Sequence, residues 1–263
     1  MIQPFWSVLA ATVVAGTALS AQASDSLVIR GRQLARDHPA AGLRLFEQAL
    51  EHDSLDYEAN WRAAVALADL GQETPDEASS PARDSLYSRA ERYARRAVAA
   101  DTTGPDGYFA LAMALGRVAL TKGTRERLRF AEAIRNAALR SVALNPAHDG
   151  AHHVLGLWNA EVMRLSGLSR FIARSLLGGR ILSLASWEEA ITQLSEAVRL
   201  DSTRIYHRLD LARVLIDRKR YREARRELEL VAVLPDQGPQ DRRYRREAAL
   251  LLIRIEGKTD KQA

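Results

Sequence analysis

The sequence predicts an all-α protein built from repeated helical hairpins, and three observations support this prediction. Alanine, leucine, arginine and glutamate dominate the 263 residues, whereas the helix breakers are few, with 15 glycines and 8 prolines. A short segment that closes with Asp or Asn recurs along the chain at the ends of apolar-periodic stretches. The last such stretch, residues 239–256, changes from polar to apolar, which suits a helix that covers the end of a stack.

The composition also narrows the classes of function. The chain has no cysteine, which excludes disulfides, thiolate metal sites, a cysteine nucleophile and a lipid-anchored cysteine. Hydrophobic residues make up 47% of the chain, enough for a sizeable core. The formal net charge is +5, and arginine carries far more of the positive charge than lysine. This excess favours contact with anionic surfaces without defining one.

The first 23 residues differ from the rest of the chain. They contain no charged side chain, and an apolar run from Phe5 to Leu19 ends in Ala21-Gln22-Ala23, a small-x-small cleavage pattern. The run, about 15 residues long, is shorter than the ~20 that a membrane-spanning helix needs. We therefore expect residues 1–23 to be a secretory signal peptide, with an uncleaved membrane anchor as the alternative. The mature chain, residues 24–263, would then be periplasmic or extracellular.

Four segments align at the ends of predicted second helices, and a fifth fits less well: EQALEHDS (47–54), RRAVAADT (95–102), LRSVALNP (139–146), SEAVRLDS (195–202) and LELVAVLPD (228–236). Counting back from these ends, a small position of the second helix falls on Gly42, Ala90, Ile134, Ala190 and Ala224. Only Ile134 is large. These landmarks predict hairpins at residues 25–54, 55–102, 103–146, 147–202 and 203–236, followed by a capping helix at 239–256.

The first helix of each hairpin carries a matching pair of residues, most clearly at Ala63-Ala64, Leu111-Ala112, Leu155-Gly156 and Leu211-Ala212. Small residues at this position let two helices approach closely, while larger residues fill the gaps between hairpins. Over most of residues 25–236 the pattern resembles the tetratricopeptide repeat family. The resemblance implies a right-handed superhelix of about five hairpins.

Insertions lengthen three of the hairpins, at residues 72–84, 122–130 and 166–186. The motifs around the longest insertion are Asn145-Pro146, Leu155-Gly156, Trp158 and Glu188-Glu189-Ala190. With these motifs, residues 86–235 resemble the helical domain of the regulator of microtubule dynamics family. The resemblance implies a tetratricopeptide-like fold and a binding role. Some animal members of that family act at membranes, and one is associated with phospholipid binding and transfer.

The stretch HDGAHHVLGLW, residues 148–158, holds three histidines in six positions. His148 and His152 are four apart, which is metal-ligand spacing if both share a helix face. The repeat phase instead places His148 before the helix, His152 at a packing position and His153 on the inner surface. Asp149, the nearest acid, suits the helix N-terminus better than a metal. We therefore predict no metal site, and keep a histidine-based metal-dependent enzyme as the third alternative for the function.

Motifs for catalysis or cofactor binding are missing from the sequence. It contains no Gly-x-Ser-x-Gly, no phosphate-binding Gly-rich loop and no His-Glu-x-x-His. Paired acids such as Glu188-Glu189 and Glu227/Glu229 stand beside arginines on predicted helix surfaces, where such charges are solvated. We therefore expect a non-enzymatic protein without a cofactor.

In a solenoid of this type the first helices line a concave groove, which positions 2, 5, 9 and 12 of each hairpin face most directly. The candidate groove residues are mainly apolar and aromatic: Trp61, Val65, Phe109, Met113, His153, Leu157, Tyr206, Leu209, Arg213 and Ile216. The lysine and asparagine pattern that captures a peptide's C-terminal carboxylate is missing. We expect a protein or peptide partner, with a phospholipid or another apolar ligand as the alternative. Arg213, with Arg117 or Arg164, would hold an anionic end of that ligand.

Two basic groups are candidates for peripheral contact with an anionic membrane. One lies in the long insertion, whose apolar residues between 168 and 184 would alternatively fold back and fill the groove. The other lies on the capping helix and continues to Lys258 and Lys261. The arginines concerned are Arg170, Arg174, Arg180, Arg242, Arg243, Arg245 and Arg246. Nucleic-acid binding is disfavoured by the export signal and the lack of a recognition motif.

Overall fold

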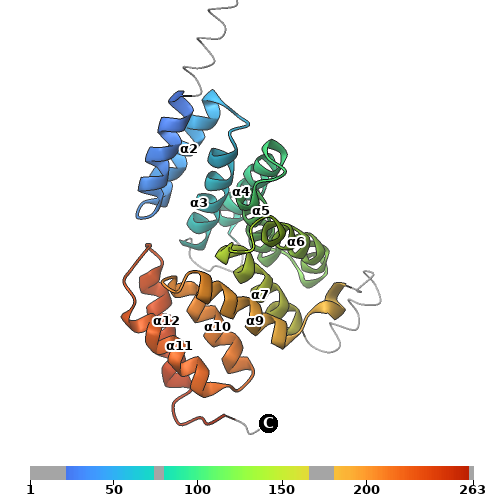
Figure 1. Ribbon diagram of the computed structural model, residues 1–263, viewed down its shortest axis with the longest axis vertical. Helices are drawn as coiled ribbons and strands as arrows, with labels where there is room; N and C mark the ends of the chain where they lie inside the picture. The colour runs from blue at the N-terminus through green and yellow to red at the C-terminus, as the bar shows by residue number, and fades with distance from the viewer. Residues whose placement is uncertain (1–21, 74–79, 166–180, 261–263) are drawn as a thin grey trace, which may run out of the picture.

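The computed structural model describes residues 22–73, 80–165 and 181–260, and Figure 1 shows their course. These described residues form helices, turns and loops without any strand, so the predicted all-α fold class is confirmed. The predicted signal peptide and most of the insertion at 166–186, including its three arginines, lie outside the described residues. Within the described part of the chain, no helix is both long and apolar enough to cross a membrane.

Consecutive helices pack against each other along the stack. Short turns join most of them, while the connections at residues 74–79 and 166–180 lie outside the described residues. A helix at residues 22–35 comes first. The others are α2 (Pro39–His52), α3 (Tyr57–Glu73), α4 (Pro81–Ala100), α5 (Pro105–Leu120), α6 (Thr124–Leu144), α7 (Asp149–Arg164), the short 3-10 helix η1 (Ile181–Leu184), α9 (Trp187–Leu200), α10 (Ile205–Asp217), α11 (Tyr221–Val233) and α12 (Asp241–Arg254). Helix α12 packs on α10 and α11 at the end of the stack.

The recurring Asp or Asn has a local physical cause. Asp101 follows the last residue of α4, and its Oδ1 accepts hydrogen bonds from the backbone N–H of Thr103 at 2.8 Å and from the Thr103 hydroxyl at 2.7 Å. Asn145 accepts in the same way from the backbone N–H of Ala147 at 3.0 Å. A carboxylate or amide that bonds the backbone two residues on closes a tight turn. The repeated segment ends are therefore helix-to-helix turns.

The small residues of the repeat lie where helices touch. A Cβ atom added at Gly156 on α7 would come within 2.5 Å of the Leu194 side chain on α9, so only glycine permits this approach. Ile134, the large residue at a small position, is buried on α6 against a different neighbourhood. It belongs to a cluster with Leu115 and Trp158, in which its volume fills space that alanine would leave empty.

The hydrophobic core is divided along the stack. One cluster joins the N-terminal helices around Phe46 and Leu67, and another joins α9 to α12 around Leu194 and Leu228. The cluster that contains Trp158 lies between them, on α5, α6 and α7. The two end clusters share no buried residue, so direct contact between the first and last hairpins must come from other side chains.

Candidate binding surface and the polar network across it

The first helices of the hairpins each present one partly exposed face to a common side of the molecule, which we call the inner face. On α3 this face repeats every three or four residues, which is the spacing of one helix face. These helices are neighbours in the stack, since α3 packs on α5, α5 on α7 and α7 on α10. The inner face consists of Trp61, Val65, Asp69 and Gln72 on α3, Phe109, Met113 and Arg117 on α5, His153, Leu157, Glu161 and Arg164 on α7, and Tyr206, Asp210, Arg213 and Asp217 on α10.

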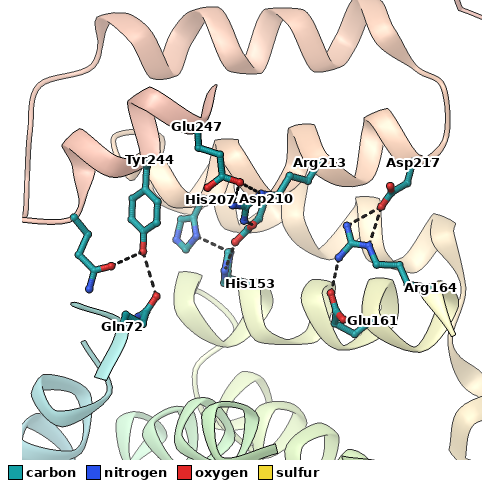
Figure 2. A network of polar contacts seen from close by, with 11 residues as sticks. Gln72, His153, Glu161, Arg164, His207, Asp210, Arg213, Asp217, Tyr244 and Glu247 are labelled. Carbon is teal, nitrogen blue, oxygen red and sulfur yellow. Dashed lines mark hydrogen bonds and ion pairs between the residues drawn. The ribbon is translucent and has the colours of Figure 1, made fainter. Parts of the chain in front are cut away.

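Helix α12 reaches the inner face and touches α3, as Figure 2 shows around Tyr244 and Gln72. The Tyr244 hydroxyl lies 3.4 Å from Gln72 Oε1 and 3.2 Å from Gln240 Oε1. Gln240 Nε2 donates to the backbone carbonyl of Asp69 at 3.0 Å, and Arg243 Nη1 donates to that of Gln72 at 3.0 Å. Helix α12 and Gln240 before it therefore return to the first half of the chain through these polar contacts, which we call the latch.

Beside the latch, α10 and α12 are joined by an ion-pair network. Arg213 lies between two carboxylates, those of Asp210 on its own helix and Glu247 on α12. At the C-terminal end of α7, Arg164 Nη2 pairs with Asp217 at 2.7 Å and Nη1 with Glu161 at 2.5 Å (Figure 2). Arg213 and Arg164 are thus already neutralised by the protein itself, so neither is available as the free anionic-end anchor that the sequence predicted.

Two histidines form the buried centre of this network. Nδ1 of His153 on α7 lies 3.0 Å from Nδ1 of His207 on α10. The outer nitrogens face carboxylates: His207 Nε2 lies 2.9 Å from Asp149 Oδ2, and His153 Nε2 lies 3.2 Å from Asp210 Oδ2. His207 has no exposed surface, and His153 is 8% exposed. Four side chains thus form one chain of contacts between the fourth and fifth hairpins.

The carboxylates of this chain are held ionised. Burial alone would raise the pKa of Asp149, but the hydrogen bond from His207 and the charge of Arg204 lower it to about 2. Burial alone would also raise the pKa of Asp210, but its contacts with His153 and Arg213 lower it to about 2. Burial lowers the pKa of His207 to about 4. At neutral pH both aspartates are therefore anions.

The other two histidines of the 148–153 stretch have separate partners. His148 Nδ1 accepts from the backbone N–H of Ala151 at 3.2 Å and so caps the start of α7, while its ring packs against Phe109. The nitrogens of His152 lie 2.6 Å from Gln193 Oε1 and 2.9 Å from the carbonyl of Pro146. No group of three His, Cys, Asp or Glu side chains that could hold a metal ion occurs among the described residues.

Most of the predicted groove residues are partly exposed, but Leu209 is buried. Trp61, Val65 and Met113 are partly exposed on α3 and α5, and pack with their bases on the N-terminal core. Leu157, Ile216 and Phe109 are partly exposed too. Leu209 is fully buried in the C-terminal core, so it offers no surface to a partner and its assignment to the groove fails.

Sequence reasoning missed the carboxylates of the inner face. Asp69 and Asp210 belong to it, yet the predicted groove contained no acidic side chain. A signal was present in the spacing, because Asp69 follows Val65 by four residues and Asp210 follows Tyr206 by four. Burial raises the pKa of Asp69 to about 6, against the lowering effect of Arg117.

The predicted basic cluster of α12 is partly used inside the protein. Arg245 pairs with Asp236 at 2.7 Å, Arg242 lies 3.8 Å from the same carboxylate, and Arg243 belongs to the latch. Arg246 is exposed. The cluster therefore contacts Asp236 in the turn before α12 and Gln72 on α3, which reduces what it can offer to an anionic surface.

Stacked helical hairpins with small residues at the crossings and a shared inner face define a helical repeat protein of the tetratricopeptide type. More particularly, residues 22–256 match the family model described as Regulator of microtubule dynamics protein 1-3, and the chain belongs to that family. No curated protein sequence matches the chain significantly.

Solved structures show the same fold. The thermophilic tetratricopeptide protein TTC0263 of Thermus thermophilus is 24% identical, with a TM-score of 0.61 over 88% of this chain and 100% of that one. PilF of Pseudomonas aeruginosa is 16% identical, with a TM-score of 0.52 over 91% of this chain and 95% of that one. At this identity the likeness concerns the fold.

Proposed function

We propose that the protein is a non-enzymatic binding scaffold whose inner face on α3 and α5 receives a protein or peptide partner. The observation that carries the proposal is the state of Trp61, Val65 and Met113. They pack at their base on the N-terminal core but stay partly exposed, whereas the hydrogen bonds of α12 to α3 fall further along that helix, at Asp69 and Gln72. Apolar side chains in this state lower the free energy when a partner buries them.

The surroundings of Trp61 suit an anchor for a partner. The Arg62 guanidinium lies 4.2 Å from the centre of the indole ring and is held by Glu58, with Nε 2.6 Å from Oε1. A cation stacked on a ring limits its rotation, so less entropy is lost when a partner packs on the other side. Large aromatic side chains with little freedom dominate the affinity of protein interfaces.

The polar groups of the inner face support binding rather than catalysis. Among the described residues, the imidazoles of His153 and His207 and the carboxylates of Asp149 and Asp210 contact one another. A general acid or base must instead reach a proton of the substrate. A histidine-based metal-dependent enzyme gains no support from these contacts.

A capture experiment tests the proposal. Mature protein is used to bind partners from the envelope fraction of its own host, with mass spectrometry of proteins and lipids, in parallel with Trp61→Ala and with Val233→Ala, which changes an exposed side chain on α11. We expect a protein or peptide that Val233→Ala retains and Trp61→Ala binds about thirtyfold more weakly, since an aromatic anchor contributes ~2 kcal/mol. Recovery of phospholipid alone, or equal binding by both variants, would contradict the proposal.

We further propose export of the chain, on the strength of the uncharged N-terminal segment. Ser24, the expected first residue of the mature chain, is buried, and its hydroxyl donates to Asp56 Oδ2 at 2.8 Å. Cleavage before Ser24 would therefore leave a terminus that packs on the first hairpin. N-terminal sequencing of protein from the native host should begin at or near Ser24, whereas intact Met1 in the membrane pellet would show an anchor.

A further inference from the structure

The contact between His153 and His207 raises a question of proton count. Each Nε2 faces an ionised aspartate, so each Nε2 must carry a hydrogen in order to donate to it. If both rings were neutral, both Nδ1 atoms would then present lone pairs to each other across 3.0 Å. That arrangement is repulsive, whereas one additional hydrogen between the two atoms turns it into a hydrogen bond of ordinary length.

We propose that His153 and His207 share one additional proton at neutral pH, so that four ring nitrogens carry three hydrogens, and that this proton holds the fourth hairpin against the fifth. The contacts that depend on this proton connect Asp149 and His153 on α7 with His207 and Asp210 on α10, and we call this set of contacts the joint. Both a rise and a fall in pH therefore weaken the joint.

The charges that face the pair agree with this count. From α7 and α10 these are Asp149, Asp210 and Arg213, with Arg204 just before α10 and 3.6 Å from Asp149. Helix α12 contributes Glu247, which pairs with Arg213. Three carboxylates thus meet two guanidinium groups, and one shared proton makes the set neutral. The phenols of Tyr206 and Tyr244, whose pKa values burial raises, stay uncharged.

The roles of the two rings differ. Burial lowers the pKa of His207 to about 4, which makes His207 the neutral ring that accepts through Nδ1. His153 then donates through Nδ1 to His207 and through Nε2 to Asp210. In acid, His207 takes up a second proton and two N–H groups oppose each other. In alkali, the shared proton is lost and the lone pairs oppose each other.

Nitrogen NMR of the histidine rings in the wild-type protein counts the protons directly. The signals of His153 and His207 are assigned by comparison with His207→Gln, and His38→Gln, at an exposed histidine, is the control. At pH 7 we expect one doubly protonated ring and one neutral ring with hydrogen on Nε2. Two neutral rings would overturn the proposal. Signals that shift with one equivalent of zinc and return with chelator would also overturn it, because a metal would then occupy the place of the proton.

Distances between spin labels test the joint. Because the chain has no cysteine, labels can be placed on Ala40→Cys in α2 and Ala249→Cys in α12, both exposed positions. We expect one narrow distance distribution at pH 7 and broader ones at pH 4 and pH 9, while circular dichroism still shows helices. In His207→Gln the response should disappear, and in His38→Gln it should persist. An unchanged distribution from pH 4 to pH 9 would overturn the role of the proton in the joint.

Discussion

The aromatic side chains in the two halves of the inner face have different neighbours. On α3, Trp61 packs on the N-terminal core and has the Arg62 guanidinium 4.2 Å from its ring centre. On α10, Tyr206, which is partly exposed as well, packs against His153, His207 and Tyr244 with ring centroids 5.0, 4.4 and 6.4 Å away. Helix α12 contributes to this difference, because its Tyr244 ring packs on Tyr206, whereas its hydrogen bonds to α3 fall at Asp69 and Gln72, beyond Trp61 and Val65. Register alone therefore says which side a residue faces, and the last helix decides whether that residue is available to a partner.

The largest expected effect is a difference in the loss of unfolding free energy between a substitution on α10 and one on α3. Tyr206→Ala removes a ring that touches three others in the network, and we expect the free energy of unfolding to fall by about 3 kcal/mol. Trp61→Ala, the change on α3 used for comparison, should lower it by only about 1 kcal/mol, because Trp61 packs at the edge of the N-terminal core and stays partly exposed. Denaturant unfolding of both variants checks this. Equal losses would mean that both halves are packed alike.

The next effect in size is a loss of stability of the C-terminal half in acid. The unfolded chain binds a proton at His207 near pH 6.5, but burial lowers the folded pKa to about 4. The stability that this group supports is therefore complete above pH 6.5 and is lost as the pH falls toward 4. The shift corresponds to about 3 kcal/mol. The difference in unfolding free energy between wild type and His207→Gln, followed from pH 7 to pH 4, should change by this order. A constant difference would contradict the prediction.

Asp69 should act in the opposite direction. Its folded pKa of about 6 lies above the 3.8 of an unfolded chain, so keeping it ionised costs stability above pH 6, and this cost disappears below pH 3.8. We expect Asp69→Asn to raise the free energy of unfolding by about 1 kcal/mol at pH 7, a value that allows for partial solvent exposure. Thermal melts at pH 7 and pH 3.5 should show the gain only at the higher pH. A loss at pH 7 would mean that the carboxylate serves a partner inside the protein.

Much of the fold was predictable from the sequence because its causes are local. The Asp or Asn that closes a turn, as at Asp101 and Asn145, bonds the backbone two residues further on. Gly156 is required by the close approach of one neighbouring helix. In contrast, His153 and His207 are in contact although they are 54 positions apart in the sequence. Gln240 and Asp69 are in contact although they are 171 positions apart. Such contacts follow from the accumulated angle between hairpins, which no single repeat encodes. The inner face was therefore predictable as a side of each helix, but its polar half was not.

The smallest expected effect concerns the latch and measures how much its contacts contribute to the free energy of unfolding. Gln240→Ala removes the donor to the Asp69 carbonyl and the acceptor that Tyr244 and Arg243 share, with Arg243 Nη2 2.6 Å from Gln240 Oε1. A few polar contacts at a surface contribute about 1 kcal/mol net, because water replaces most of what is lost.

Hydrogen exchange locates the effect of Gln240→Ala. We expect faster exchange at the C-terminal end of α3 and the start of α12, with α10 unchanged, since Ala248 and Ile255 keep α12 on the C-terminal core. Gln33→Ala, at an exposed glutamine of the first helix, is the matched control. Exchange that also rises throughout α10 would mean that the latch supports the whole C-terminal half. The apolar half of the inner face would then depend on α12, and a partner at Trp61 would sense the state of the joint at His207.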